Sequence, residues 1–421
     1  MTRISTLPVI ATAMLSMSAV SAHAMDVYNC KELIHCLNNS IDINLMNDIK
    51  MDNKAFKDYL DFNYTCGYRA KFDGQGHTIS GISYNDEDND CIGLIQWCNG
   101  ATVENVTVQY DKLVGDFNVG GIVGSATNST FKNCHVSGNI TSENFRQGNL
   151  GGIIGKANNC DISGCTVDAR LICDGIGAGG IVGSSYGKLN VSDCTVSGYV
   201  QADGEEMKAQ VGGIVGNVES DYDTTISNST NNARVEGMNN YIGGIIGDIH
   251  RKYDVLDNEP VITIDHCTNH GAVAAKATGF FAIDRSKCVG GIVGHTYVGI
   301  LTVNNCESTG NISGYEKIGG IIGRAEKNYA HPSLTDCKVS GNMYAETDEV
   351  KAFCGCDNVG INYNNCQENA TIYIKNMPQQ AESKTMSMTT TTDAAKKVMV
   401  GGKLTLVKAN GTTVDMSGMM R

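Results

Sequence analysis

Apolar residues along this chain fall into short segments of strand length, separated by glycines and polar residues. Within the repeated units described below, none of these segments has the length or the 3.6-residue period of a helix. One segment, Gly-Gly-Ile-Val/Ile-Gly, recurs and is called the glycine clamp. Its copies begin at Gly120, Gly151, Gly179, Gly212, Gly243, Gly290 and Gly319. Successive copies lie 28 to 47 residues apart, so the chain is a repeat protein.

A second element follows each clamp and centres on one small residue, which we call the ladder position. It is occupied by Cys134, Cys165, Cys194, Ser229, Cys267, Cys306, Cys337 and Cys366. The residue four places later is always Gly or Ala, and the residue six places later is always apolar. The residue just before is mostly Asn or Asp, types that tolerate the left-handed backbone of a corner.

These two elements predict a stacked β-structure. A unit of about 30 residues cannot bury its own apolar side, whereas stacked copies form one continuous core. Parallel stacking places equivalent residues ~4.8 Å apart, so the ladder position becomes a column of small, inward-facing side chains. The sequence therefore predicts an all-β parallel β-helix of about nine to eleven coils.

The clamp and the Asn-Cys-x-x-x-Gly element resemble the GLUG-motif repeats of bacterial exported proteins. The segments INLMNDIKM (43–51) and FDGQGHTISGI (72–82) are similar to the lead-in of such proteins. GLIQWCNGATVENVTV (93–108) follows, with Gly93-Leu94-Ile95 in the place of the motif and Val106 where later units carry Cys. The resemblance covers roughly residues 40–375. It implies a right-handed parallel β-helix on a secreted or surface protein of adhesin-like type, with no reaction, no catalytic residue and no cofactor.

The remaining segments define the predicted domain organisation. Residues 1–24 have the charged, apolar and small-residue regions of a secretory signal, with cleavage near Ala24 and Met25. Residues 25–71 form an N-terminal cap with a short helix over 28–38, and 72–375 form the repeats. Residues 376–396 are a polar linker, and 397–421 form a hairpin around Asn410-Gly411. This last segment is weakly similar to bacterial C-terminal sorting tails; a plain hairpin is the alternative.

The net charge and the apolar segments limit the kinds of partner that the chain can bind. The formal net charge is −13 and the chain has no basic cluster, which disfavours binding to nucleic acid. No apolar segment after the signal is long enough to insert into a membrane.

With 17 cysteines, at least one thiol of a single chain is unpaired. We expect the ladder thiols to be buried and mostly reduced. The cysteines expected to be more prone to disulfides are Cys30, Cys36, Cys66, Cys91 and Cys98.

Three groups have a spacing that suggests metal or redox chemistry, and each has a simpler explanation. Asp86, Asp88 and Asp90 begin like a calcium loop, but Cys91 stands where that loop needs glycine, so a solvated acidic loop is favoured. His266 and His270 have a zinc spacing only on a helix, and they fall on a strand and corner. Cys354 and Cys356 are a single Cys-x-Cys, which favours a disulfide or free thiols. We predict no metal.

A polysaccharide-degrading enzyme is the alternative function, because it would use clustered acids on neighbouring coils. The corner acids Asp193 and Asp336 lie four ladder steps apart, roughly 20 Å, and cannot cooperate. Glu205, Glu206, Asp221 and Asp223 belong to one insertion region and could meet, but loop acids commonly serve solubility. We therefore predict no catalytic activity.

Binding of an extracellular glycan or protein is the function we expect, and a purely structural surface role is a further alternative. Insertions on a rigid scaffold are where recognition is usually placed. The largest ones, at 248–260 and 276–288, supply aromatic and arginine side chains of the kind that dominate interfaces. The candidate contact residues are His250, Arg251, Tyr253, Phe280, Phe281 and Arg285. Alternatively, Phe280 and Phe281 seal a small core under their loop.

Overall fold

The computed structural model describes most of the chain between residues 24 and 375 and four strands beyond it. The described ranges are 24–62, 67–86, 89–144, 147–204, 209–219, 222–238, 241–250, 260–276, 288–297, 299–326, 330–356, 360–375, 388–389, 396–400, 403–407 and 413–415. The predicted signal segment and most of the predicted linker lie outside these ranges.

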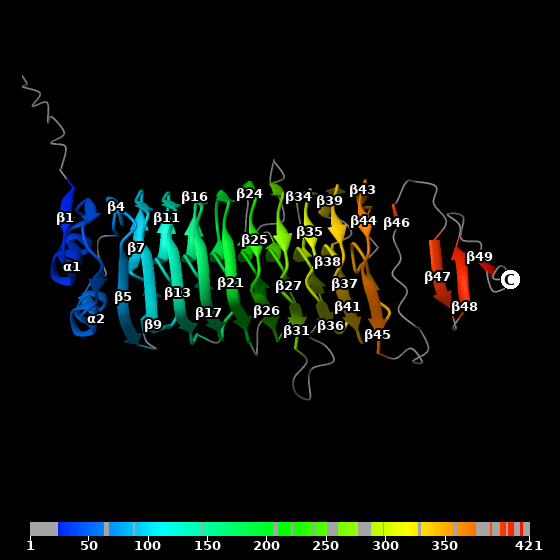
Figure 1. The fold of residues 1–421 in the computed structure, drawn as a ribbon, viewed down its shortest axis with the longest axis horizontal. Coiled ribbons are helices and arrows are strands. Elements are labelled where there is room, and N and C mark those ends of the chain that lie inside the picture. Colours follow the sequence, from blue (N-terminus) through cyan, green and yellow to red (C-terminus); the bar gives the residue numbers. More distant parts are fainter. Residues whose placement is uncertain are drawn as a thin grey trace, which may run out of the picture.

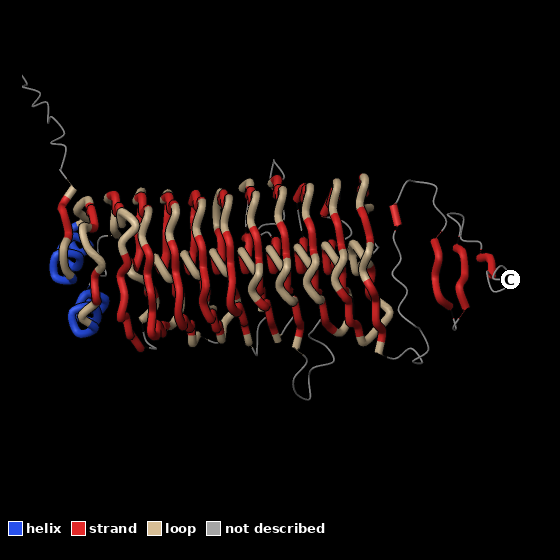
Figure 2. Tube along the Cα trace, viewed as in Figure 1, coloured by secondary structure: helices blue, strands red, loops and turns tan. Residues whose placement is uncertain are grey.

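The described residues form a parallel β-solenoid, which confirms the predicted fold class (Figure 1). Each complete coil contributes strands, in chain order, to sheets D, C, A and B, and the strands of successive coils lie side by side along the solenoid (Figure 2). Sheets A and B already have strands in the N-terminal part, whereas sheets D and C begin at Cys91 and Ile95. Sheet D contains nine strands, in line with the predicted number of coils. All pairings between coils are parallel, and equivalent residues of successive repeats pair directly, as Val136 pairs with Val167 and Val167 with Val196.

Sheets D and C hold the strands on the two sides of the glycine clamp. Sheet D consists of β6 (Cys91–Ile92), β10 (Asn118–Gly120), β14 (Asn149–Gly151), β18 (Gly177–Gly179), β22 (Gln210–Gly212), β27 (Tyr241–Gly243), β32 (Cys288–Gly290), β37 (Ile318–Gly319) and β42 (Val350–Lys351). Sheet C consists of β7 (Ile95–Asn99), β11 (Val123–Thr127), β15 (Ile154–Asn158), β19 (Val182–Ser185), β23 (Val215–Glu219), β28 (Ile246–His250), β33 (Val293–Thr296) and β38 (Ile322–Ala325).

Sheet A precedes the ladder position in each coil. It consists of β1 (Met25–Val27), β2 (Ile43–Leu45), β4 (Lys71–Asp73), β8 (Thr102–Glu104), β12 (Thr130–Lys132), β16 (Cys160–Ser163), β20 (Leu189–Ser192), β24 (Thr224–Ser227), β29 (Val261–Asp265), β34 (Gly299–Asn304), β39 (Ala330–Thr335) and β43 (Asn362–Asn364).

Sheet B follows the ladder position, and its strand is continuous in the first coils but divided in two from β25 onward. The undivided strands are β3 (Ile49–Lys50), β5 (Thr78–Asn85), β9 (Thr107–Gly115), β13 (His135–Ser142), β17 (Thr166–Cys173) and β21 (Thr195–Ala202). The divided ones are β25 (Thr230–Asn231) and β26 (Arg234–Gly237), β30 (Thr268–Asn269) and β31 (Val273–Ala275), β35 (Glu307–Ser308) and β36 (Ile312–Gly314), β40 (Lys338–Val339) and β41 (Asn342–Ala345), and β44 (Gln367–Glu368) and β45 (Thr371–Ile374).

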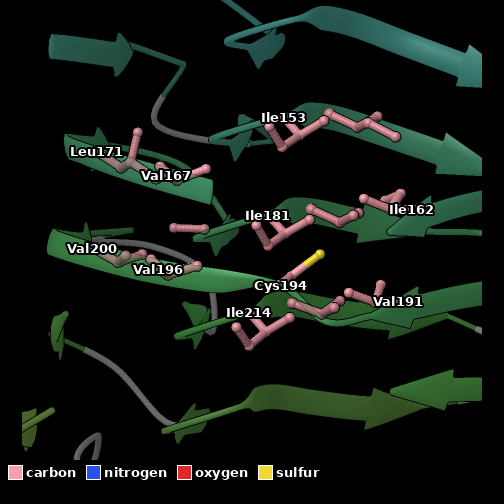
Figure 3. Packing of buried hydrophobic residues seen from close by; sticks show 14 of the residues in the cluster. Ile153, Ile162, Val167, Leu171, Ile181, Val191, Cys194, Val196, Val200 and Ile214 are labelled. Atoms are coloured by element: carbon pink, nitrogen blue, oxygen red, sulfur yellow. The ribbon is translucent and has the colours of Figure 1, made fainter. Parts of the chain in front are cut away.

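The core consists of columns of identical or similar side chains, one per coil. Ile153, Ile181 and Ile214 form one such column, and Val167 and Val196 belong to another (Figure 3). The ladder residues are buried throughout, with exposed fractions of at most 1%. Stacking of equivalent apolar residues gives every inner side chain a shape-matched neighbour above and below, which is how a thin coil acquires a core.

The corner before the ladder position has a left-handed backbone in every repeat. The φ angle there lies between 49° and 63° at Asn105, Asn133, Gly164, Asp193, Asn228, His266, Asn305, Asp336 and Asn365. Asparagine, aspartate and glycine tolerate this conformation better than other residues. The repeated Asn or Asp therefore marks a corner, as predicted from the sequence.

The clamp glycines are required by close backbone contacts and not by unusual dihedral angles. A Cβ atom on Gly179 would lie 1.9 Å from the carbonyl oxygen of Val182, across the turn between sheets D and C. A Cβ atom on Gly183 would lie 2.6 Å from the carbonyl oxygen of Gly155 in the previous coil. Sheets D and C thus pack backbone against backbone, and no larger residue fits.

Two helices lie at the N-terminal end of the solenoid, where the sequence predicted one (Figure 1). Helix α1 (Cys30–Asn39) is preceded by its N-cap Asn29, whose side chain accepts a hydrogen bond from the Glu32 amide. Helix α2 (Asn53–Phe62) was not predicted. Its signal was present: the Asp52 carboxylate accepts from the Lys54 and Ala55 amides, in the manner of a helix N-cap.

The C-terminal segment forms a three-stranded antiparallel sheet of β47 (Lys396–Val400), β48 (Lys403–Val407) and β49 (Thr413–Asp415). Strands β48 and β49 flank the predicted Asn410-Gly411 turn, which lies outside the described residues. The predicted linker contains one short strand, β46 (Met388–Thr389), which pairs antiparallel with β44. Among the helices in the described ranges, neither is long and apolar enough to cross a bilayer.

Candidate functional site

The predicted contact residues lie mostly beyond what the structure describes. Arg251, Tyr253, Phe280, Phe281 and Arg285 are outside the described residues, so their role stays a prediction. His250 is described at the end of β28. It is half-buried, and its Nδ1 lies 3.1 Å from Oδ2 of Asp248.

His250 borders a polar column that we call the seam, where sheets D and C pack against each other. A sheet D residue contacts the sheet C residue of the following coil. Ser184 Oγ lies 2.5 Å from Asn149 Oδ1, and Gln210 Nε2 donates to Asp248 Oδ2 at 2.8 Å. One coil later, the ring of Tyr241 stacks on that of His295, with centroids 4.1 Å apart. The seam residues are Asn149, Ser184, Gln210, Asp248, Tyr241 and His295.

The charged members of the seam neutralise each other. Nδ1 of His295 donates to Oδ1 of Asp248 at 2.7 Å, and its Nε2 lies 3.4 Å from Oε1 of Glu326. Burial raises the pKa of Asp248, but hydrogen bonds from His250 and His295 outweigh it and hold the pKa at about 2. Burial opposes the charged imidazole of His295, yet its two carboxylate partners raise its pKa. Each group therefore favours the charged form of the other.

A second cluster lies on sheet B around Glu236, which is 1% exposed. Its carboxylate contacts the Tyr199 hydroxyl, the Arg234 guanidinium and the Lys276 ammonium. Burial raises the pKa of Glu236, but these three contacts outweigh it and lower the pKa. The Arg170 guanidinium lies over the Tyr199 ring, 4.9 Å from its centroid. The cluster thus joins four successive coils, which contribute Arg170, Tyr199, Glu236 and Lys276 in turn.

Two exposed tyrosines occupy the last coils of sheet B. Tyr344 and Tyr373 stack with ring centroids 4.9 Å apart and planes at 9°, and their exposed fractions are 42% and 40%. Each stands seven residues after a ladder cysteine, Cys337 and Cys366. The sequence analysis did not use that position. A comparison of outward-facing residues between repeats would have found this pair.

The ladder thiols are buried, and no disulfide occurs among the described cysteines. Cys30, Cys36, Cys91 and Cys98, expected to favour disulfides, are free thiols with other contacts. Cys30 and Cys36 contact the sulfur atoms of Met51 and Met25, Cys91 contacts the Gln96 carbonyl, and Cys98 contacts the Ser129 hydroxyl. Their preference for disulfides was therefore a wrong inference, and Cys66 lies outside the described residues.

The histidine and aspartate candidates for metal binding contact other residues. His266 contacts Asp265 in its own coil, whereas His270 contacts Thr309 in the next coil. The Asp86 carboxylate binds Lys57 and the Tyr84 hydroxyl. Throughout the described ranges, no group of three or more His, Cys, Asp and Glu side chains has an arrangement that could hold a metal ion. Asp88 lies outside them, and Cys354 donates to the Cys356 carbonyl.

The predicted acidic residues that the structure describes have separate contacts. Asp193 and Asp336 occupy corners of separate coils with φ angles of 56° and 53°. Asp223 accepts a hydrogen bond from the Val261 amide at 2.9 Å. Glu205, Glu206 and Asp221 lie outside the described residues, so their clustering stays a hypothesis.

Comparison with known proteins agrees with the predicted resemblance. The family model of the GLUG motif matches residues 115–141, the stretch that contains β10, β11 and β12. The chain is thus a parallel β-solenoid protein that carries the GLUG motif. It is also similar to halomucin from Haloquadratum walsbyi, with 36% identity over 78 residues. That match covers 18% of this chain and 1% of halomucin, so the chain spans a small part of that relative.

Among solved structures, the chain matches a Bacteroides ovatus protein provisionally described as an immunoglobulin A1 protease. The sequence identity is 14% and the TM-score is 0.40. The match covers 86% of this chain and 80% of that one. A likeness at this level carries no information on activity.

Proposed function

We propose that this protein is exported and acts as a secreted or cell-surface binding protein, of adhesin-like type, without catalytic activity. The signal-like N-terminus, the GLUG motif and the rigid solenoid support this proposal. Its ligand is an extracellular glycan or protein.

The observation that carries the proposal is the division between constant and variable positions. The ladder, the corner and the clamp are constant, and all three serve packing inside the solenoid or at its turns. The outward positions vary from coil to coil: the sheet B position seven after the ladder is Glu236, Ala274, Ser313, Tyr344 or Tyr373 in successive coils. Variable residues on a rigid scaffold are where recognition is usually placed.

The described carboxylate clusters favour binding over hydrolysis. A glycosidase needs one carboxyl group that holds a proton and a second that is free to act. The carboxylate oxygens of Glu236 are already bound by Tyr199, Arg234 and Lys276, and its pKa is lowered. Asp248 is saturated by His250 and His295, and its pKa is lowered as well. Neither carboxyl group suits a general acid near neutral pH.

Binding is tested with the chain from Met25 on arrays of glycans and extracellular proteins. We expect specific binding to at least one array member, and no turnover of acidic or neutral polysaccharides. Replacement of 251–259 or 277–287 by a short Gly/Ser segment tests whether these loops contribute, because it keeps the strand residues at their ends. Turnover abolished by Glu205→Ala or Asp223→Ala would establish the enzyme instead, and silence in both assays would leave a structural role.

Export and retention are tested separately by cell fractionation. The chain should be found outside the cytoplasm, with residues 1–24 removed. A chain lacking 397–421 should lose its surface location if this segment is a sorting tail. An unchanged location would leave the tail as a terminal sheet.

A further inference from the structure

The outer side of sheet B carries a row of residues that we call the tyrosine strip. It consists of the positions seven residues after the ladder in four successive coils: Ala274, Ser313, Tyr344 and Tyr373. Direct strand pairing places them side by side, since Ala274 pairs with Ser313, Ser313 with Tyr344, and Tyr344 with Tyr373. Glu236 pairs with Ala274 and ends the strip at its other side.

The strip is flat at one end and aromatic at the other. The Tyr344 and Tyr373 rings are nearly parallel and one strand spacing apart, so each covers one face of the other. On its opposite side, Tyr344 has Ser313 as its neighbour in the column, and Ala274 follows. A serine and an alanine rise little above a sheet. One face of the Tyr344 ring therefore borders a low step two residues long.

Hydrogen-bonding groups surround this step. Asn311 is exposed beside Ser313 and accepts a hydrogen bond from the Asn342 amide in the next coil. At the far end, Lys276 contacts the Glu236 carboxylate and donates to the Tyr199 hydroxyl at 3.3 Å. The distance from Glu236 to Tyr344 is three strand steps, about 14 Å. An aromatic wall, a flat floor and polar groups on two sides thus occur together.

This combination suits a sugar chain better than other ligands. A pyranose ring presents apolar C–H groups on its faces, which pack on an aromatic ring, and hydroxyl groups at its rim, which need hydrogen-bond partners. The repeat of an extended hexose polymer is close to the ~4.8 Å strand spacing, so one sugar meets each coil. The net charge of −13 opposes polyanions such as nucleic acids and acidic glycans.

We propose that the tyrosine strip binds a neutral polysaccharide that lies along the solenoid axis. One sugar ring packs on the free face of Tyr344, above Ser313, and the next one lies above Ala274. Asn311 and the Lys276 ammonium, which is 42% exposed at the edge of the Glu236 cluster, bind the hydroxyl groups. This inference rests on the proposed binding function and specifies its ligand.

The test measures binding by calorimetry, with the chain from Met25. The probes are three neutral polysaccharides (a β-glucan, a mannan and a xylan), and a polygalacturonate and a hyaluronate as acidic ones. We expect a neutral polymer to bind, and Tyr344→Ala to weaken it about tenfold or more. Tyr344→Phe, which keeps the ring, should retain most of the affinity. Ser313→Tyr should weaken binding as strongly as Tyr344→Ala, because the added ring covers the exposed face of Tyr344.

Tyr28→Ala is the matched control, because Tyr28 is 50% exposed but lies at the N-terminal end, before α1. It should leave the affinity unchanged. Thermal unfolding of each variant checks the fold, which should persist because all the substituted side chains face outward.

Several results would overturn the inference. Neutral-polymer binding that is unaffected by Tyr344→Ala and Ser313→Tyr would place the ligand elsewhere. Binding of the acidic polymers alone would assign the wrong ligand class. Binding to a protein on the arrays but to none of these polysaccharides would overturn the strip while leaving the proposed function intact. Absence of binding in every assay would overturn both.

Discussion

The first coils and the middle coils of the solenoid fill the same inner column with different chemistry. Two residues after the ladder, the first coils carry Val136, Val167 and Val196, all buried. The next three coils carry Asn231, Asn269 and Ser308 at this position, each with an exposed fraction of 0%. Valine then returns at 339.

The two asparagines of this run depend on each other, whereas the buried Ser308 hydroxyl has no hydrogen-bond partner among the described residues. Asn231 Nδ2 donates to Asn269 Oδ1 at 2.8 Å, so one amide satisfies the next. The Asn231 side chain also bonds both the amide and the carbonyl of Ala233, groups at the point where the sheet B strand divides. A single buried asparagine between valines would lack such partners. The division of the strand persists past Val339, so the amides are not its sole cause.

The residue types of the seam also differ between the early and the middle coils. It holds the neutral pair Asn149 and Ser184 in the early coils and the charged pair Asp248 and His295 in the middle. A stacked fold therefore changes character in blocks of coils, because each side chain depends on its equivalents above and below.

The glycine clamp does not differ between the two regions, so its loss should cost both the same. We expect Gly179→Ala and Gly212→Ala each to destabilise by about 3 kcal/mol or more, or to prevent folding. In both, a Cβ atom would lie 1.9 Å from a carbonyl oxygen across the turn. Urea unfolding measures the effect. Gly360→Ala is the control, with no atom within 4 Å, and should be near neutral. A tolerated Gly179→Ala would show that the clamp can open.

The inner column should distinguish the regions. Asn269→Ala removes the acceptor of Asn231 Nδ2 and the donor to the Gly271 carbonyl, and should cost about 3 kcal/mol. Val167→Ala removes only apolar contacts and should cost about 2 kcal/mol. Both are measured by urea unfolding. If Asn269→Ala proved the milder change, the amide run would not support the middle coils.

The charged seam should make stability depend on pH. The lowered pKa of Asp248, about 2, contributes stability that is present above its unfolded value near 4 and is lost as pH falls toward 2. The raised pKa of His295 contributes stability that is complete below its unfolded value near 6.5 and is lost as pH rises through the folded value. Each loss has a slope of at most about 1.4 kcal/mol per pH unit.

The measurement is urea unfolding across pH 3 to 9 for the wild type and for His295→Gln. The variant should lose the decline on the alkaline side. As a control, Ser184→Ala in the neutral part of the seam should leave the shape of the curve unchanged. The same alkaline decline in His295→Gln would assign it to another group.

The fold was predictable because its rules repeat. One corner residue with positive φ, one small ladder residue and one clamp recur in every unit, so each copy supports the others. The candidate sites were less predictable, since they depend on single outward residues that pair across coils. Tyr344 and Tyr373 are 29 residues apart in the chain, and only the register brings their rings together.

The seam illustrates a second reason. Gln210 and Asp248 belong to different sheets and successive coils, and their contact depends on how closely the clamp folds sheet C onto sheet D. The sequence indicates a tight turn there, but not which side chains meet across it. The insertion-loop residues were chosen by composition alone, and of these only His250 lies in the described part of the chain.

The smallest effect on the free energy of unfolding should come from a substitution of Ser229, the one residue with a hydroxyl group among the ladder cysteines. Its Oγ donates to the Ser227 carbonyl at 2.8 Å and accepts from the Cys194 amide at 3.2 Å. The thiols of Cys194 and Cys306 also donate to the carbonyl two residues before them, at 3.2 and 3.0 Å. Ser229→Cys should therefore keep the first bond and weaken the second, with a net change within about 1 kcal/mol.

Ser229→Cys also tests whether the column acts as small apolar filling. In the folded variant, the new thiol should resist alkylation as Cys194 does, because a neighbouring thiol and burial raise the pKa of Cys194. Denaturation should then expose one more reactive thiol than in the wild type, counted by mass spectrometry. Cys194→Ser is the reciprocal control and should be equally mild. A loss above about 2 kcal/mol in Ser229→Cys alone would mean that the amide of Cys194 needs its oxygen acceptor, because a buried unsatisfied donor costs that much. Serine would then be required at this ladder position, and cysteine could not replace it.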